Sequence, residues 1–89
     1  MQETNLNGYE LTNKWYATIA GRDDIKPVHH AIFFWCLHLS NRLGWKEEFG
    51  LPSYDTMEVL GIGNFRTFKA AVYKLDEINV IQVISWSKN

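Results

Sequence analysis

Apolar residues recur every three or four positions in four segments of the chain, the spacing of helices that bury one face. The predicted helices are residues 9–20, 27–43, 54–60 and 64–78. A β-rich run over residues 80–86 follows, and residues 49–51 are a second, shorter candidate strand. Residues 1–8 are polar and predict a flexible lead-in, so residues 9–89 make up the single predicted domain.

Turn-forming residues predict where the helices begin and end. Pro27 suits the first position of a helix, because its missing N–H would have no partner there. Ser53 and Asn64 are candidate N-caps, whose side-chain oxygens can accept hydrogen bonds from the first turn. Gly44 and Gly61 supply left-handed backbone for stopping the preceding helices. The third and fourth helices are therefore joined by a short turn.

The second predicted helix is apolar nearly all round, which indicates burial on more than one side. Its main apolar stripe is made of Val28, Ile32, Trp35, Cys36, Leu39 and Leu43. Phe33, Phe34 and Leu37 lie away from that stripe. Either the first helix, with its own apolar residues four apart, covers this second side, or a second copy of the chain covers part of it.

The last predicted helix separates an apolar face from a polar one. Its inward set is Phe65, Phe68, Ala71, Val72 and Leu75, and Tyr54, Met57 and Leu60 are the expected buried residues of the helix before it. The polar face suits DNA, because Arg can bind guanine or phosphate and Lys can pair with phosphate. The candidate DNA-binding residues are Asn64, Arg66, Thr67, Lys69, Tyr73, Lys74 and Lys88, the last near the end of the β-rich run. An ordinary solvated face is the alternative, which the acidic Asp76 and Glu77 support.

Composition limits the partners that this face can have. The 89 residues carry nine Lys plus Arg against ten Asp plus Glu, a net charge of −1. Any DNA contact must therefore come from a local basic face, since DNA-binding domains usually carry excess positive charge. The single cysteine, the lack of a secretory signal and the short longest apolar run, residues 31–37, predict a cytoplasmic protein without membrane contact.

The chemistry-bearing residues do not form a catalytic or metal-binding pattern. His29, His30, Cys36 and His38 point in different directions on a helix, and no two histidines have the i, i+4 spacing that shares an ion. The two histidines near the helix start are expected at the surface or in an interface. Cys36 and His38 also diverge too far to act as nucleophile and base. We expect no enzyme activity, no metal and no cofactor.

From Leu60 the chain reads Leu-Gly-Ile-Gly-Asn-Phe-Arg-Thr-Phe-Lys-Ala-Ala-Val-Tyr-Lys-Leu-Asp-Glu-Ile-Asn-Val-Ile. This run resembles winged-helix DNA-binding domains. With residues 26–35 and 41–52 before it, the chain is similar to the N-terminal domain of phage-type and DnaD-like replication proteins over residues 26–88. The turn carries one residue more than the usual pattern, and Asn79 replaces a common Gly.

The resemblance implies a mostly α fold with a small β-sheet: a winged helix-turn-helix with a three-helix core, an N-terminal helix and a short or truncated wing. It implies a role in replication initiation, and self-association as a second property. The first hypothesis is a non-catalytic module, for replication initiation or transcription control, that presents helix 64–78 to the major groove of double-stranded DNA. The alternative is a protein–protein interaction domain that pairs with itself or with replisome proteins. The β-rich run has no return strand in this sequence, which leaves open whether the chain is part of something longer.

Overall fold

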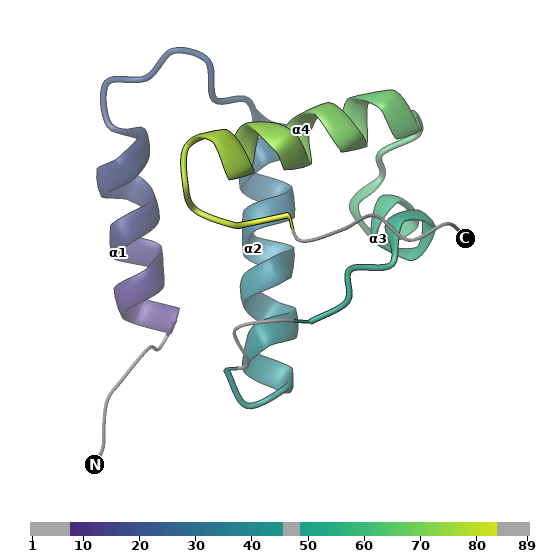
Figure 1. Cartoon of the computed structure of the whole chain (residues 1–89), viewed down its shortest axis with the longest axis horizontal. Coiled ribbons are helices and arrows are strands. Elements are labelled where there is room, and N and C mark those ends of the chain that lie inside the picture. Colours follow the sequence, from purple (N-terminus) through teal and green to yellow (C-terminus); the bar gives the residue numbers. More distant parts are fainter. Residues whose placement is uncertain (1–7, 46–48, 84–89) are drawn as a thin grey trace.

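The computed structural model describes residues 8–45 and 49–83, and these form four helices (Figure 1). They are α1 (Gly8–Ile19), α2 (Pro27–Arg42), α3 (Ser53–Leu60) and α4 (Phe65–Glu77). Each predicted helix is present, and every observed end lies within one residue of its expected position. The periodicity of apolar residues therefore located the helices correctly.

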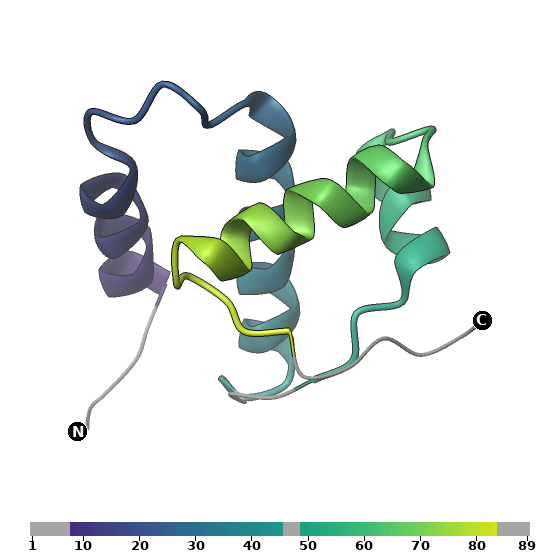
Figure 2. The same cartoon turned by 45° about the horizontal axis from the view of Figure 1, so that its top comes forward.

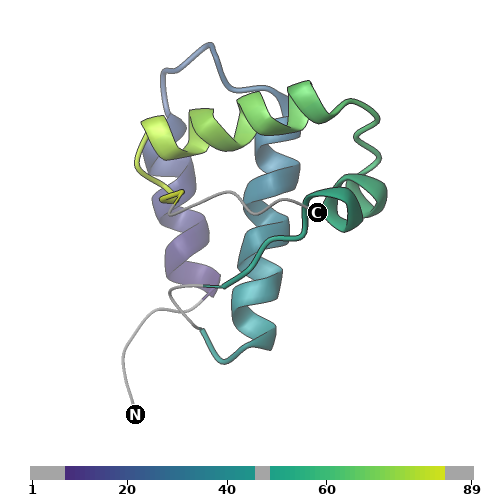
Figure 3. The same ribbon diagram turned by 45° about the vertical axis from the view of Figure 1, so that its right-hand side comes forward.

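The helices pack around α2. The helix α1 runs alongside α2 in the opposite direction, because the loop between them reverses the chain (Figures 1 and 3). The helix α4 crosses α2 and makes the most extensive helix–helix contact in the described structure. The helix α3 packs against both α2 and α4, and Figure 2 shows α3 and α4 joined by a short turn. The arrangement leaves one side of α4 at the surface of the molecule.

The core draws side chains from all four helices. Its buried apolar members are Trp15, Ile32, Phe33, Met57, Phe68, Ala71, Val72, Leu75 and Ile78. Four of the five residues predicted to face inward from α4 are among them, whereas Phe65 is 37% exposed. On α3, Tyr54 was wrongly expected in the core and is 61% exposed. Thr56 is buried instead of Tyr54. The face of α3 that turns towards the core is therefore rotated about the helix axis from the face that the spacing of apolar residues predicted.

The helix α1 covers the second side of α2. The indole of Trp15 stacks on the ring of Phe33, with centroids 4.5 Å apart and planes 10° from parallel. Its Nε1 donates a hydrogen bond to His30 Nδ1 at 3.1 Å. Trp15 is 1% exposed, so it contributes both apolar burial and a satisfied polar group to this contact. Of the two explanations offered for the apolar surface of α2, cover by the first helix therefore accounts for the side that carries Phe33.

Three helices end in the same hydrogen-bonded turn. After α4, Asn79 has a φ of 67°, its N–H donates to the Asp76 carbonyl, and the N–H of Val80 donates to the Leu75 carbonyl. This pair of bonds is the Schellman motif, which needs a left-handed residue just past the helix. Gly44 and Gly61 hold the equivalent positions after α2 and α3, with φ of 77° and 74°. The predicted glycine stops are confirmed, and Asn79 adopts the same left-handed conformation as these glycines.

The helix starts agree with the sequence signals except at α3. Pro27 is the first residue of α2, as predicted. The Asn64 side-chain oxygen accepts a hydrogen bond from the Thr67 N–H at 3.1 Å, which confirms the N-cap of α4. Ser53 is the first helical residue of α3 and Pro52 occupies the cap position, so the predicted Ser53 cap is wrong.

The described residues contain no β-strand, so the predicted winged helix-turn-helix with a small sheet is wrong. Residues 49–51 are irregular, and the chain bends back on α4 over residues 80–83. The N–H of Val80 caps α4, and the Val83 N–H donates to Asp76 Oδ2 at 3.1 Å. These two backbone N–H groups bond to residues of α4 and are not available to a neighbouring strand. The side chains of Val80, Ile81 and Val83 pack against the core. The rest of the expected wing strand, residues 84–86, lies outside the described residues.

Candidate nucleic-acid interface

The outward face of α4 carries most of the residues predicted to bind DNA. Phe68, Val72 and Leu75 hold the opposite face in the core, at 0%, 4% and 0% exposure. The predicted residues that lie exposed at the surface are Asn64, Arg66, Thr67, Lys69 and Tyr73. Lys88 lies outside the described residues. The helix therefore brings five of the seven predicted residues to one exposed surface, which we call the α4 face.

Asn64 has a structural task on this face. Its Oδ1 accepts the Thr67 N–H and so satisfies one of the donors that a helix start leaves unpaired. The sequence predicted this residue both as a cap and as a DNA contact. The cap uses the amide oxygen, which leaves the amide NH₂ as the group that can face a ligand.

Lys74 is set apart from the α4 face by ion pairs. Its Nζ lies 3.0 Å from Asp24 Oδ2 and 3.4 Å from Glu77 Oε1, and its side chain is only 27% exposed. The hydrogen bond that Lys74 Nζ donates to Asp24, opposed by partial desolvation and reinforced by the charges of both carboxylates, raises the pKa of Lys74. Its charge is therefore already balanced by protein carboxylates, which weakens the prediction that it contacts DNA.

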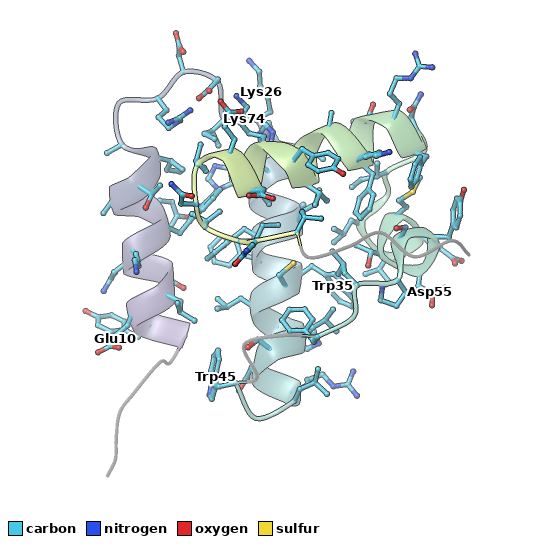
Figure 4. The ribbon with its side chains drawn as sticks, viewed as in Figure 1. Glu10, Lys26, Trp35, Trp45, Asp55 and Lys74 are labelled. Atoms are coloured by element: carbon cyan, nitrogen blue, oxygen red, sulfur yellow. The ribbon has the colours of Figure 1, made fainter. Side chains whose placement is uncertain are left out.

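Asp24 links the loop between α1 and α2 to α4. Arg22 donates to both of its oxygens, from Nε at 3.0 Å and from a terminal nitrogen at 2.9 Å. The pKa of Asp24 is held well below its ordinary value, first by the Arg22 hydrogen bonds and then by Lys74. In Figure 4, Lys74 lies at the end of α4 that faces this loop. The sequence analysis missed the cluster because Asp24 and Lys74 lie 50 positions apart, and no local pattern connects them.

A second feature missed by the sequence is an aromatic pair where α3 and α4 meet. The rings of Tyr54 and Phe65 are stacked, with centroids 5.9 Å apart and planes at 28°. Phe65 also lies against the buried Phe68, with centroids 6.4 Å apart. Tyr54 was assigned to the core from its spacing in α3, and its exposure places this ring on the surface next to the first turn of α4.

The histidines at the start of α2 are structural, contrary to the expectation that they lie at the surface or in an interface. His29 is 7% exposed, and its Nδ1 accepts the Lys26 N–H at 2.8 Å. Burial, followed by the nearby positive charge of Lys74, lowers the pKa of His29. His30 accepts the bond from Trp15 described above. Both rings therefore accept hydrogen bonds within the protein: His29 at the start of α2, and His30 from Trp15 across the α1–α2 contact.

The cysteine of α2 is equally unsuited to chemistry. Burial raises the pKa of the Cys36 thiol to about 12, so at neutral pH it is the unreactive protonated form. Within residues 8–45 and 49–83, no three His, Cys, Asp or Glu side chains are grouped so as to hold a metal ion. In the same residues, no helix is both long and apolar enough to span a bilayer.

Comparison with known proteins found no match: no protein-family description, no curated protein and no solved structure is significantly similar to this chain. The α4 face and its surroundings are therefore the features from which a function can be inferred.

Proposed function

We propose that this protein is a non-catalytic DNA-binding module that presents the α4 face to the major groove of duplex DNA. The observation that supports this most directly is the division of α4 into two faces. Phe68, Val72 and Leu75 fix one face in the core, which leaves Arg66 and Tyr73 directed away from it. Replication initiation or transcription control in the cytoplasm is the proposed setting, in line with the resemblance to replication proteins.

The dimensions of α4 support this proposal. Thirteen residues at about 1.5 Å per residue give a rod of about 20 Å, and a helix with its side chains is about as wide as the major groove. The helix lies at the edge of the molecule, joined to α3 by a short turn (Figure 2). Ala70 lies in the middle of the exposed face, where a small side chain permits close approach.

The charges of the α4 face predict a weak and salt-sensitive interaction. Arg66 and Lys69 are its exposed cations, and the Lys74 side chain is only 27% exposed. Two phosphate contacts correspond to a slope of about −2 when the logarithm of the binding constant is plotted against the logarithm of salt concentration. The near-neutral chain adds no long-range attraction to DNA, so affinity should be measurable only at low salt.

The test is fluorescence anisotropy of a labelled mixed-sequence duplex, titrated with the protein at several salt concentrations. The double variant Arg66→Ala/Lys69→Ala is expected to lose binding and its salt dependence. Lys74→Ala is the matched control, because it removes one cation from the same helix but one that Asp24 and Glu77 already neutralise. Its slope should remain close to that of the wild-type protein. Equal duplex affinity of the folded double variant and the wild type would refute the proposal.

A protein-interaction domain is the second candidate, and exposed apolar side chains away from α4 favour it. Tyr9 and Tyr16 on α1 are 78% and 52% exposed, and Leu43 after α2 is 50% exposed. Such residues are typical of contact with another protein, either a second copy or a component of a replication assembly. Sedimentation over a concentration series distinguishes self-association: a monomer at every concentration would exclude a homodimer.

A further inference from the structure

The aromatic pair of Tyr54 and Phe65 lies beside the α4 face but has no part in the proposed contact with duplex DNA. Tyr54 is 61% exposed although it stacks on Phe65, so one side of its ring is covered while the rest faces solvent. Phe65 is in turn supported by the buried Phe68. The pair therefore continues a row of neighbouring rings that begins at the buried Phe68 and ends at an exposed tyrosine.

We propose that Tyr54, supported by Phe65, is a stacking platform for an unpaired base next to the duplex held by α4. This inference rests on the proposed function and extends it to the form of the DNA, which would be a duplex with a single-stranded extension. Bases stack on exposed aromatic rings of proteins regardless of their sequence, because every base presents a flat π-face. A ring already fixed by a neighbouring ring loses little side-chain freedom when a base is added.

Charge indicates the direction in which the strand would run. Arg66 follows Phe65 directly, and Lys69 lies one helical turn further along the same side of α4. These cations suit the phosphates on either side of the stacked base. Asp55 and Glu58 are the exposed charged residues of α3, and both repel phosphate. The strand should therefore pass from Tyr54 towards α4 and not along α3.

The experiment compares two labelled DNAs in the same anisotropy assay: a blunt duplex, and that duplex with an unpaired thymine tail on either strand. The wild-type protein should bind one tailed form at least about fivefold more tightly than the blunt form, the lower end of a single stacking contact. Tyr54→Ala should abolish this preference and leave the affinity for blunt duplex unchanged. Tyr54→Phe keeps the ring and should keep the preference.

Val59→Ala is the matched control, since Val59 lies on the same helix with nearly the same exposure, 59%, and should leave both affinities unchanged. An absent preference for tailed DNA, or one that survives Tyr54→Ala, would overturn the inference while leaving duplex binding intact. Binding of tailed DNA that needs Tyr54 but is unaffected by Arg66→Ala/Lys69→Ala would instead refute the proposed duplex contact. Concentration-dependent sedimentation of the wild-type protein that disappears in Tyr54→Ala would assign the ring to contact between copies and likewise overturn the inference.

Discussion

Replacing Thr56 by Val should stabilise the protein, because the wild-type side chain buries a hydroxyl group that has no partner in the described part of the chain. Thr56 is 1% exposed, and its Oγ1 has no hydrogen-bond partner among the described residues. A threonine in a helix often bonds to the carbonyl four residues earlier. Here the Pro52 carbonyl accepts the backbone N–H of Thr56 at 2.9 Å, and the hydroxyl makes no such bond. Valine has nearly the same shape and places a methyl group where the hydroxyl lies.

The expected gain follows from the cost of an unpaired buried hydroxyl, about 1–3 kcal/mol in proteins. Val and Thr have similar helix propensities, so α3 itself should be little affected. We expect the free energy of unfolding to rise by about 1–2 kcal/mol. A chain of 89 residues is typically stable by about 4–13 kcal/mol, so the change is a substantial fraction of the total. The midpoint of thermal unfolding should rise by about 4 °C or more.

Urea unfolding followed by tryptophan fluorescence measures this change, with two control variants. Thr56→Ser keeps the hydroxyl and removes the methyl group, so it should destabilise the protein by about 1 kcal/mol. Thr67→Val makes the same chemical change at an exposed position of α4 and should stay within about 0.5 kcal/mol of the wild type. If Thr56→Val were neutral or destabilising, the hydroxyl would have a partner, for example a buried water, and the reasoning would be wrong.

Three further predictions concern His29 at the start of α2, Gly61 in the turn after α3, and Cys36 within α2. Folding lowers the pKa of His29 from 6.5, so the stabilisation that this residue provides should be complete above pH 6.5 and should fall as the pH drops towards the folded pKa. His29→Gln keeps an acceptor for the Lys26 N–H but does not titrate. In urea unfolding, the free energy of unfolding of this variant should therefore vary less between pH 7 and pH 5. Gly61→Ala should cost about 1–2 kcal/mol because its φ is 74°, whereas Gly63→Ala, at a position without positive φ, should be neutral or slightly stabilising in the same assay. Cys36 is partly buried and its thiol pKa is raised, so it should react with iodoacetamide much more slowly in the native protein than in urea, as followed by mass spectrometry; equal labelling rates would contradict the raised pKa.

The α4 face shows how far local pattern reaches into a candidate site. A helix with Phe68, Val72 and Leu75 on one side must expose Arg66 and Tyr73 on the other, since helical geometry fixes their relative directions. The sequence analysis could therefore name the surface before any tertiary contact was known. It could not tell that Lys74 is paired with Asp24, because that pairing depends on how the loop before α2 packs on α4.

The two largest errors both came from local pattern at places where tertiary packing decides the structure. A strand was predicted over residues 80–86 from β-propensity, which is weak evidence where no partner strand is present. The apolar side chains of Val80, Ile81 and Val83 are instead used to cover the core after the Asn79 turn. Tyr54 was placed in the core from its spacing, but a helix of eight residues gives too few positions to fix which face turns inward.

The sequence alone determined the four helices and most of their ends. The signals that mark them, which are apolar periodicity, proline at a helix start and left-handed glycine at a helix end, depend only on residues a few positions apart. Only the tertiary structure decided what covers each face: Trp15 on Phe33, Tyr54 on Phe65, and Asp24 on Lys74. These contacts join segments that are distant in the chain, and their geometry depends on how whole helices pack. The side chains that surround the α4 face were therefore beyond the reach of local pattern, although the face itself was not.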